Sequence, residues 1–421
     1  LFGYIVYGKF VEKVFVVNDG TPTPAYTKTD NLDYVPMPAW KGWTIQLLNI
    51  AGLGPIYGAI AGALYGPVAM VWIVLGCIFA GAVHDYFAGM LSVRHGGAQF
   101  PALVQKYLGK VMRVFTDIVS VVLMVLVAAA FTAGRAAVIS AKTGITFMLA
   151  IIIIFVYFLL AAILPINKII GRIYPIFGAV LLITAGAVLI SLLFSDIKVP
   201  ELSFANMHPS ELPVWPLLMV TISCGAISGF HSTQSPIISR TLKKETEGRK
   251  VFYGAMIGEG IIALIWCAAG MSFYGGTGEL GSVIASVGAG GVVDQISVGL
   301  LGTIGGLLAV LSVIILPITT GDTSLRSARM IVLDFLGSRV KGNPKTIAVV
   351  ATVAVTIPSF YLSTIDYQFL WRYVGMTNQM VATVMLWVAT SYLLKEAKLH
   401  WITGLPALFM TAVVFTYLMV A

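Results

Sequence analysis

The sequence predicts an all-α polytopic membrane protein, built from two inverted repeats of five helices with one helix before them and one after. Three observations carry this prediction. Of the 421 residues, 58% are hydrophobic and only 10% are charged, whereas a soluble domain carries about 25% charged residues. Apolar runs of about 20 residues, the length of a helix that crosses a bilayer, recur along the chain. Lysine and arginine gather in alternate loops between these runs.

Apolar windows bounded by glycine, proline and charged residues give the expected order of segments. These are a truncated leading helix with a polar segment behind it, a first repeat, an external loop, a second repeat and a trailing helix, at 1–42, 43–194, 195–213, 214–394 and 395–421. The expected spans of the two repeats and the trailing helix lie at 43–64, 67–93, 112–140, 145–163, 172–194, 214–239, 250–274, 296–325, 345–362, 367–394 and 401–420.

The basic residues test this count. If Lys13 is cytoplasmic, 22 of the 26 lysines and arginines fall on the cytoplasmic side, as the positive-inside rule requires. Arg135, Lys142 and Lys198 fall on the other side, and Arg372 lies within a span. The net charge of +8 therefore reflects orientation in a lipid bilayer, and no nucleic-acid partner is expected. The three cysteines, Cys77, Cys224 and Cys267, lie inside apolar spans. We interpret them as small buried residues and expect neither a metal nor a cofactor.

Two successive units of five spans enter the membrane from opposite sides, as the inverted repeats of many secondary transporters do. The corresponding spans 43–64 and 214–239 are both interrupted, by "NIAGLGPIYG" and by "SCGAISGFHSTQSPIISR". We expect helix breaks at Gly52, Gly54, Pro55, Gly225, Gly229 and Pro236. Such breaks free backbone groups that can bind a ligand. The alternative is that these glycines only let helices pack closely.

Ionisable residues inside the spans suggest how transport is driven, because charges at membrane depth are usually paired or functional. His84 and Asp85 form a proton relay or a carboxylate partnered from another helix, the alternative being a hydrated carboxylate near the surface. Glu259 has no local partner, so it is protonated or paired across helices. Asp322 and Arg326 stand four residues apart, which favours an intrahelical ion pair. The residues alone leave proton and sodium coupling both open.

Other functional classes have little support in the sequence. The five histidines form no H-E-x-x-H motif, "GAGG" lacks the lysine of a phosphate-binding loop, and no G-x-S-x-G elbow is present. A membrane hydrolase built from His84, Asp85 and His231 is a remote alternative, as is a receptor-like sensor. A channel would show a continuous polar stripe, whereas polarity here concentrates at the breaks. We therefore expect no enzymatic activity.

Six blocks spread over nearly the whole chain resemble the carbon starvation protein A (CstA) family of bacterial inner-membrane transporters. They are "YVPMPAW", "IAGLGPIYGAIAGALYGPVAMVWIVLGCIFAGAVHDYFAGMLSVRHGG", "SGFHSTQSPIISR", "VFYGAMIGEGIIALIW", "TTGDTSLRSAR" and "LWRYVGMTNQ". The resemblance implies peptide uptake during nutrient starvation and, for some members, proton-coupled pyruvate uptake. In this context the sensor alternative is a starvation sensor. It also implies a leucine-transporter-like fold of the amino acid–polyamine–organocation superfamily, with broken first and sixth core helices, in the inner membrane with 13–42 cytoplasmic.

Peptide and pyruvate both carry a carboxylate, which we expect to bind freed backbone amides near Gly52 to Gly54 and Ser228 to Gly229. His231 or Gln234 would add a side-chain bond, and a peptide would also need an acid for its amino end. The expected substrate-binding residues are Asn49, Gly52, Gly54, Ser228, Gly229, His231, Ser232, Gln234 and Thr320. The expected coupling residues are His84, Asp85, Glu259, Asp322 and Arg326. The oligomeric state is left open, as is whether the leading helix docks on the repeats or on a neighbouring copy.

Overall fold

The computed structural model describes residues 2–30, 33–163, 166–337, 342–365 and 367–420, and these form helices and no strands. The leading part and first repeat hold η1 (Gly3–Tyr7), α1 (Gly8–Phe15), α2 (Pro24–Thr27), α3 (Ala39–Ile50), η2 (Gly54–Gly58), α4 (Ala59–Gly62), η3 (Ala63–Tyr65), α5 (Val68–Gly76), η4 (Cys77–Gly81), α6 (Ala82–Arg94), α7 (Phe100–Leu108), α8 (Lys110–Thr143), α9 (Phe147–Ile163) and α10 (Ile166–Phe194). The remainder holds α11 (Val214–Thr221), α12 (Phe230–Ser239), η5 (Glu245–Glu247), η6 (Arg249–Tyr253), α13 (Gly254–Phe273), α14 (Thr277–Leu336), α15 (Pro344–Leu362), α16 (Tyr367–Lys395) and α17 (Trp401–Val420).

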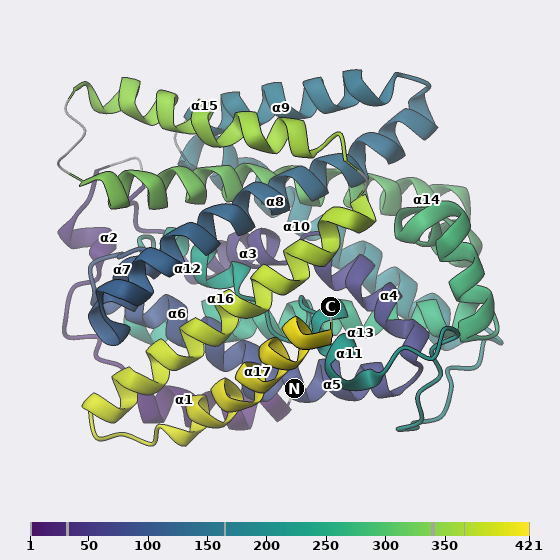
Figure 1. The fold of residues 1–421 in the computed structure, drawn as a ribbon, viewed down its shortest axis with the longest axis horizontal. Coiled ribbons are helices and arrows are strands. Elements are labelled where there is room, and N and C mark those ends of the chain that lie inside the picture. Colours follow the sequence, from purple (N-terminus) through teal and green to yellow (C-terminus); the bar gives the residue numbers. More distant parts are fainter. Residues whose placement is uncertain (1, 31–32, 164–165, 338–341, 366, 421) are drawn as a thin grey trace.

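The predicted fold class is confirmed, because a helix or an interrupted helix occupies every expected span. Within the described residues, six helices are long and apolar enough to cross a membrane, or seven if α3 and the helix that follows its break are counted as one bent span. Figure 1 shows α9, α15 and much of α14 running along the long axis, while α8 and α16 run beside each other on a diagonal across the view.

Two helical regions were missed. The segment 277–295, which lies between the expected spans 250–274 and 296–325, is helical and continues into the long part of α14, with non-helical backbone at Gly288 and Gly302 (φ +70° and +67°). A helix can stop and restart at such residues, because glycine adopts positive φ without a steric penalty. These pieces lie at the right-hand end of Figure 1. The second missed helix, α7, lies in a basic loop.

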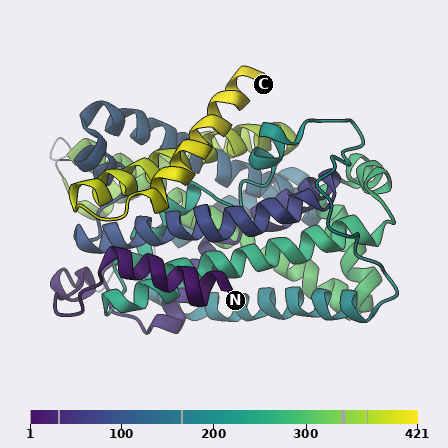
Figure 2. The same ribbon diagram turned by 90° about the horizontal axis from the view of Figure 1, so that it is seen from below.

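The leading helix packs on the repeats of its own chain, a question that the sequence left open. Phe15 of α1 stacks edge-on with Tyr86 of α6, their ring centroids 5.5 Å apart. The carboxylate of Glu12 accepts a hydrogen bond from Arg249 at 2.9 Å. Figure 2 shows this helix, in purple, on the outside of the helices of both repeats.

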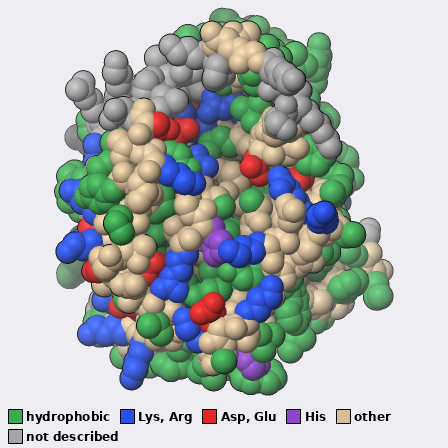
Figure 3. All heavy atoms as spheres, turned by 90° about the vertical axis from the view of Figure 1, so that its left-hand side faces the viewer, with side chains coloured by type: hydrophobic (Ala, Val, Ile, Leu, Met, Phe, Trp, Pro, Cys, Tyr) green, Lys and Arg blue, Asp and Glu red, His purple; other side chains and the backbone are tan. Residues whose placement is uncertain are grey.

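Lysine and arginine gather at one end of the molecule, the left-hand end of Figure 1, which faces the viewer in Figure 3. The segment after α1 crosses this end and is tied to the loop behind α12. The Thr23 hydroxyl donates to the Leu242 carbonyl at 2.5 Å, and the Met37 amide donates to the Thr241 carbonyl at 2.9 Å. We refer to this end as the basic end and to the opposite one as the loop end, since it carries the loop 195–213.

Candidate functional site

The first break lies where the sequence predicts it. The helix α3 ends at Ile50, and η2 begins at Gly54 after three residues outside any helix. The two halves meet at an angle of 58°. Pro55 stands in the first turn of the resumed helix, where its missing N–H breaks no intrahelical hydrogen bond.

The second break is longer. The helix α11 ends at Thr221 and α12 begins only at Phe230, with Gly225 in the left-handed region at φ +89°. Pro236, predicted to be part of this break, instead lies inside α12. A proline removes a single backbone hydrogen bond, and in a membrane helix neighbouring groups compensate for that loss. Glycine, rather than proline, thus positions the break.

The two breaks touch each other and a third helix, α16. A Cβ atom added to Gly54 would overlap the side chain of Cys224, and one added to Gly229 would overlap the backbone of α16. The Asn378 side chain of α16 accepts hydrogen bonds from the Phe230 amide at 2.7 Å and the Ser228 hydroxyl at 3.1 Å. One of the amides freed by the second break is therefore held by the protein itself.

A cluster of ionisable side chains surrounds the start of α12. Asp85 of α6 lies between two histidines, with 2.8 Å from Oδ1 to His84 Nδ1 and 2.8 Å from Oδ2 to His231 Nδ1. The other ring nitrogen of His231, Nε2, is 3.3 Å from Glu259 Oε2 of α13. All four side chains are fully buried, so Asp85 is not a hydrated surface carboxylate. Both Asp85 and Glu259 find their partner on another helix.

The charges of this cluster depend on how many protons it holds. His231 is hydrogen-bonded to Asp85 through Nδ1 and faces Glu259 with Nε2, and a position between two carboxylates favours the imidazolium cation. With both acids ionised and His84 neutral, the cluster then carries one net negative charge. Burying a net charge away from water is costly, and one further proton on Glu259 removes that charge. The arrangement can therefore take up and release a single proton.

The side chains of the remaining predicted polar residues of α12 form hydrogen bonds with groups in the same helix or just before it. The Ser232 hydroxyl donates to the Gly229 carbonyl at 2.7 Å, and the Gln234 amide donates to Thr233 Oγ1 at 3.0 Å. Thr320 and Asn49 lie at the first break instead. The Thr320 hydroxyl is 3.4 Å from the Leu48 carbonyl, and Asn49 is buried in the last turn of α3.

Arg326, predicted as a coupling residue, lies toward the basic end. Its Nη1 is 3.9 Å from Asp33 Oδ1 in the segment after α1, and Asp33 Oδ2 is also 3.9 Å from Arg240 Nη1. These contacts tie α14 and the chain just after α12 to the segment that crosses the basic end. Asp322, one turn before Arg326, is fully buried in α14.

Sequence reasoning gave no site role to Cys224, Asn378 or Arg135. Cys224 Sγ, a His231 ring nitrogen and a Glu259 oxygen lie within 4.8 Å of one another, a set of donors that suits a metal ion. Ligands around tetrahedral zinc stand roughly 3.5 Å apart, so these three donor atoms would have to move closer together to bind a zinc ion.

Arg135 was counted only as an external basic residue, although its place in "AAAFTAGRAAVIS", deep in an apolar span, was a usable signal.

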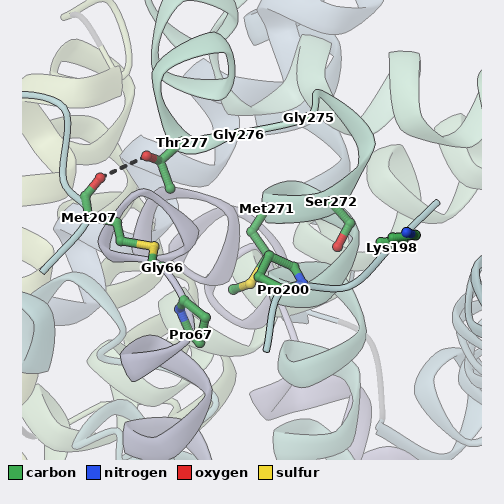
Figure 4. Close-up of a pocket in the computed structure, with 10 residues that line it drawn as sticks. All are labelled: Gly66, Pro67, Lys198, Pro200, Met207, Met271, Ser272, Gly275, Gly276 and Thr277. Atoms are coloured by element: carbon green, nitrogen blue, oxygen red, sulfur yellow. Dashed lines mark hydrogen bonds between the residues drawn. The ribbon is translucent and has the colours of Figure 1, made fainter. Parts of the chain in front are cut away.

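A cavity of about 920 Å³ opens between the two repeats at the loop end. The lining includes Tyr57 just after the first break, Gly134 of α8, Asp294 of α14, and Tyr367 and Trp371 of α16. A smaller cavity of about 290 Å³ lies nearby, where the Thr277 hydroxyl donates to the Met207 carbonyl (Figure 4). The large cavity leads toward the first break, and the small one contains none of the predicted site residues.

Comparison with known proteins agrees with this architecture. The family model described as carbon starvation protein CstA matches residues 1–153, 135–277 and 276–417. The chain belongs to this family. An uncharacterized membrane protein of Haemophilus influenzae is 45% identical over 328 residues, covering 65% of this chain and 88% of that protein. The peptide transporter CstA of Bacillus subtilis is 25% identical over 499 residues, covering 94% and 83%.

Two further comparisons extend the family match. The pyruvate/proton symporter BtsT of Escherichia coli is 25% identical over 334 residues, which cover 63% of this chain and 46% of that protein. Among solved structures, MhsT in complex with L-phenylalanine superposes with a TM-score of 0.61 at 15% identity, covering 90% of this chain and 97% of that chain. The CstA-family chain therefore has the leucine-transporter-like fold.

Proposed function

We propose that the chain is a secondary transporter that takes up peptides by alternating access and is driven by protons. The observation that carries this proposal is the buried His231 between Asp85 and Glu259, placed where α12 resumes after its break. A group that exchanges one proton beside the broken helices can link protonation to their movement. The similarity to named peptide transporters supports the choice of substrate.

In this proposal, 43–194 and 214–394 act as two five-helix units that move around the breaks. The protein lies in the inner membrane with its basic end in the cytoplasm, as the positive-inside rule requires. The cavity at the loop end then faces outward, while the contacts of Asp33 with Arg240 and Arg326 help to close the cytoplasmic side. Inward opening would separate these contacts.

The arrangement of His231 argues against hydrolysis. A histidine base needs one ring nitrogen oriented by an acid and the other free to accept a proton from a nucleophile. Here Asp85 occupies Nδ1 and Glu259 faces Nε2. A site with carboxylates on both sides of the imidazole holds a proton, and we propose transport as its use.

The second candidate, a pyruvate–proton symporter, has the similarity to the pyruvate/proton symporter in its favour. Pyruvate has no amino group, whereas a peptide needs an acid at its amino end. Asp85 and Glu259 are fully buried against His231, so neither is open to the cavity. Asp294 is a carboxylate that lines the cavity. The peptide is favoured because the named peptide transporter matches 94% of this chain, whereas the named pyruvate symporter matches 63%.

Uptake by purified protein in sealed liposomes tests the proposal. Labelled di- and tripeptides and labelled pyruvate are offered under an inward proton gradient, with a sodium gradient as a parallel arm. We expect peptide accumulation that collapses with an uncoupler. Pyruvate accumulation alone would select the second candidate. Accumulation that follows sodium alone, or facilitated entry of a substrate without accumulation, would refute proton coupling.

Asp85→Asn should lower proton-driven uptake on the order of 100-fold. An amide cannot accept from both histidines with full charge, so His231 loses the partner that keeps it protonated. Initial uptake rates in liposomes check this result. Asp196→Asn makes the same chemical change in the external loop and should leave uptake unchanged. Normal uptake by Asp85→Asn would remove this carboxylate from the coupling mechanism.

A further inference from the structure

The most unusual group outside the proton-binding cluster is the guanidinium of Arg135 in α8. Its side chain is 0% exposed, and none of its three nitrogens has a hydrogen-bond partner among the described residues. Arginine stays charged in proteins and carries five N–H donors. Leaving such a cation buried without a negatively charged partner is costly. This cost suggests that the N–H donors of Arg135 bind a ligand when the protein functions.

The position of Arg135 links it to the first break. Phe131, one turn earlier on the same face of α8, is the side chain that a Cβ atom on Gly52 would meet. Gly134, the neighbour of Arg135, faces Leu53 and the Tyr367 ring, at 3.6 Å and 3.3 Å from a Cβ placed there. Arg135 therefore lies one turn toward the loop end from the place where α3 stops.

The surroundings of Arg135 supply further donors. Its guanidinium lies beside the hydroxyl group of Tyr57, just after the first break, whose oxygen can accept from it, and within electrostatic reach of the hydroxyl group of Tyr367, at the start of α16. Both hydroxyl oxygens are buried and lack a hydrogen-bond partner among the described residues. The two rings meet edge-on, with centroids 5.9 Å apart. One cation and two hydroxyls thus lie together, and the ion pairs of the described residues place no carboxylate on the cation.

This donor set borders the large cavity. Tyr57, Gly134 and Tyr367 line it, while Arg135 is fully buried behind them. An anion that entered from the loop end would reach the two tyrosines first and the guanidinium next. A guanidinium binds a carboxylate through two parallel hydrogen bonds, which fixes its orientation as well as its charge.

We propose that Arg135, with the hydroxyls of Tyr57 and Tyr367, binds the carboxylate of the transported substrate. This rests on the proposed function and names the recognition group, a side-chain cation in place of the backbone amides expected from the sequence. Because the guanidinium contacts both the resumed first helix and α16, substrate binding draws those two elements together. The site accepts carboxylates and rejects the corresponding amides, which leave the cation unpaired.

Tryptophan fluorescence of the purified full chain tests the proposal directly. Trp371 stacks on Tyr367 with ring centroids 5.5 Å apart, so occupancy of the site should change its emission. The probes are dialanine, pyruvate and acetate, each compared with its amide. We expect saturable changes with carboxylates only. Arg135→Gln should weaken their binding on the order of 30-fold or more, and Arg135→Lys should weaken it less.

Arg372→Gln is the matched control, because Arg372 lines the same cavity and undergoes the same chemical change. Its carboxylate affinity should stay near that of the wild type. Tyr57→Phe removes one donor and keeps the cation, and it should weaken carboxylate binding about tenfold. This variant tests the site if Arg135→Gln does not fold. Wild-type carboxylate affinity in Arg135→Gln, or no saturable carboxylate binding in the wild type, would overturn the proposal.

The same proteins in liposomes separate this inference from the proposed function. If carboxylate binding depends on Arg135 but the wild type transports neither peptide nor pyruvate, the proposed carboxylate site is supported and the proposed transport function is refuted. If the wild type transports a carboxylate and Arg135→Gln does so with unchanged KM, transport stands and the site assignment fails.

Discussion

Glu259→Gln should abolish proton-driven accumulation while leaving substrate exchange close to the wild-type rate. The amide has the shape of the protonated carboxylic acid, so it fixes the cluster in its neutral form next to a cationic His231. The two broken helices can still move with substrate bound, which is all that exchange requires. Release of the proton can no longer occur, and we expect accumulation to fall on the order of 100-fold.

Two liposome assays check this expectation on one preparation. Accumulation is measured under an inward proton gradient, and exchange is measured with labelled substrate outside and unlabelled substrate inside, without a gradient. Glu201→Gln makes the same change in the external loop, where the side chain is exposed, and should be normal in both assays. Equal loss of accumulation and exchange would assign Glu259 to substrate binding or folding rather than to coupling.

The fold was predictable from the sequence because the bilayer imposes strong local rules. A membrane span needs about 20 apolar residues, and basic residues mark the cytoplasmic ends. Glycine-rich interruptions such as those around Gly52 and Gly225 were therefore visible as breaks in a regular pattern. Where the pattern is weaker, prediction failed. The glycines of 288–291 suggested a loop, yet helices form on both sides of Gly288.

The candidate site was only partly predictable, because distances between helices are absent from the sequence. Ionisable residues at membrane depth selected His84, Asp85, His231 and Glu259, but not the fact that His231 lies between the two acids. The sequence therefore assigned His231 to substrate binding and Asp85 and Glu259 to coupling, although these three side chains lie next to one another. The count of basic residues considered only on which side of the membrane Arg135 lies and not how deep it lies in its span, so its burial was missed.

Gly229→Ala should destabilise the folded protein by about 3 kcal/mol, and it shows why this glycine is a poor test of substrate binding. A methyl group at this position would overlap the backbone carbonyl of Asn378 and the backbone amide of Ala382. Side chains can rotate away from such a clash, but the backbone of a packed helix cannot. The helix α16 must then move away from α12, which weakens the Phe230–Asn378 hydrogen bond.

Thermal unfolding in detergent and the yield of monodisperse protein measure this loss. Gly186→Ala is the matched control, because a Cβ atom there meets nothing within 4 Å in α10, and its stability should match or exceed that of the wild type. A stable Gly229→Ala would mean that α16 yields at this contact. In that case the gap between the second break and α16 opens readily, and the freed amides near Gly229 return as candidates for binding the substrate carboxylate.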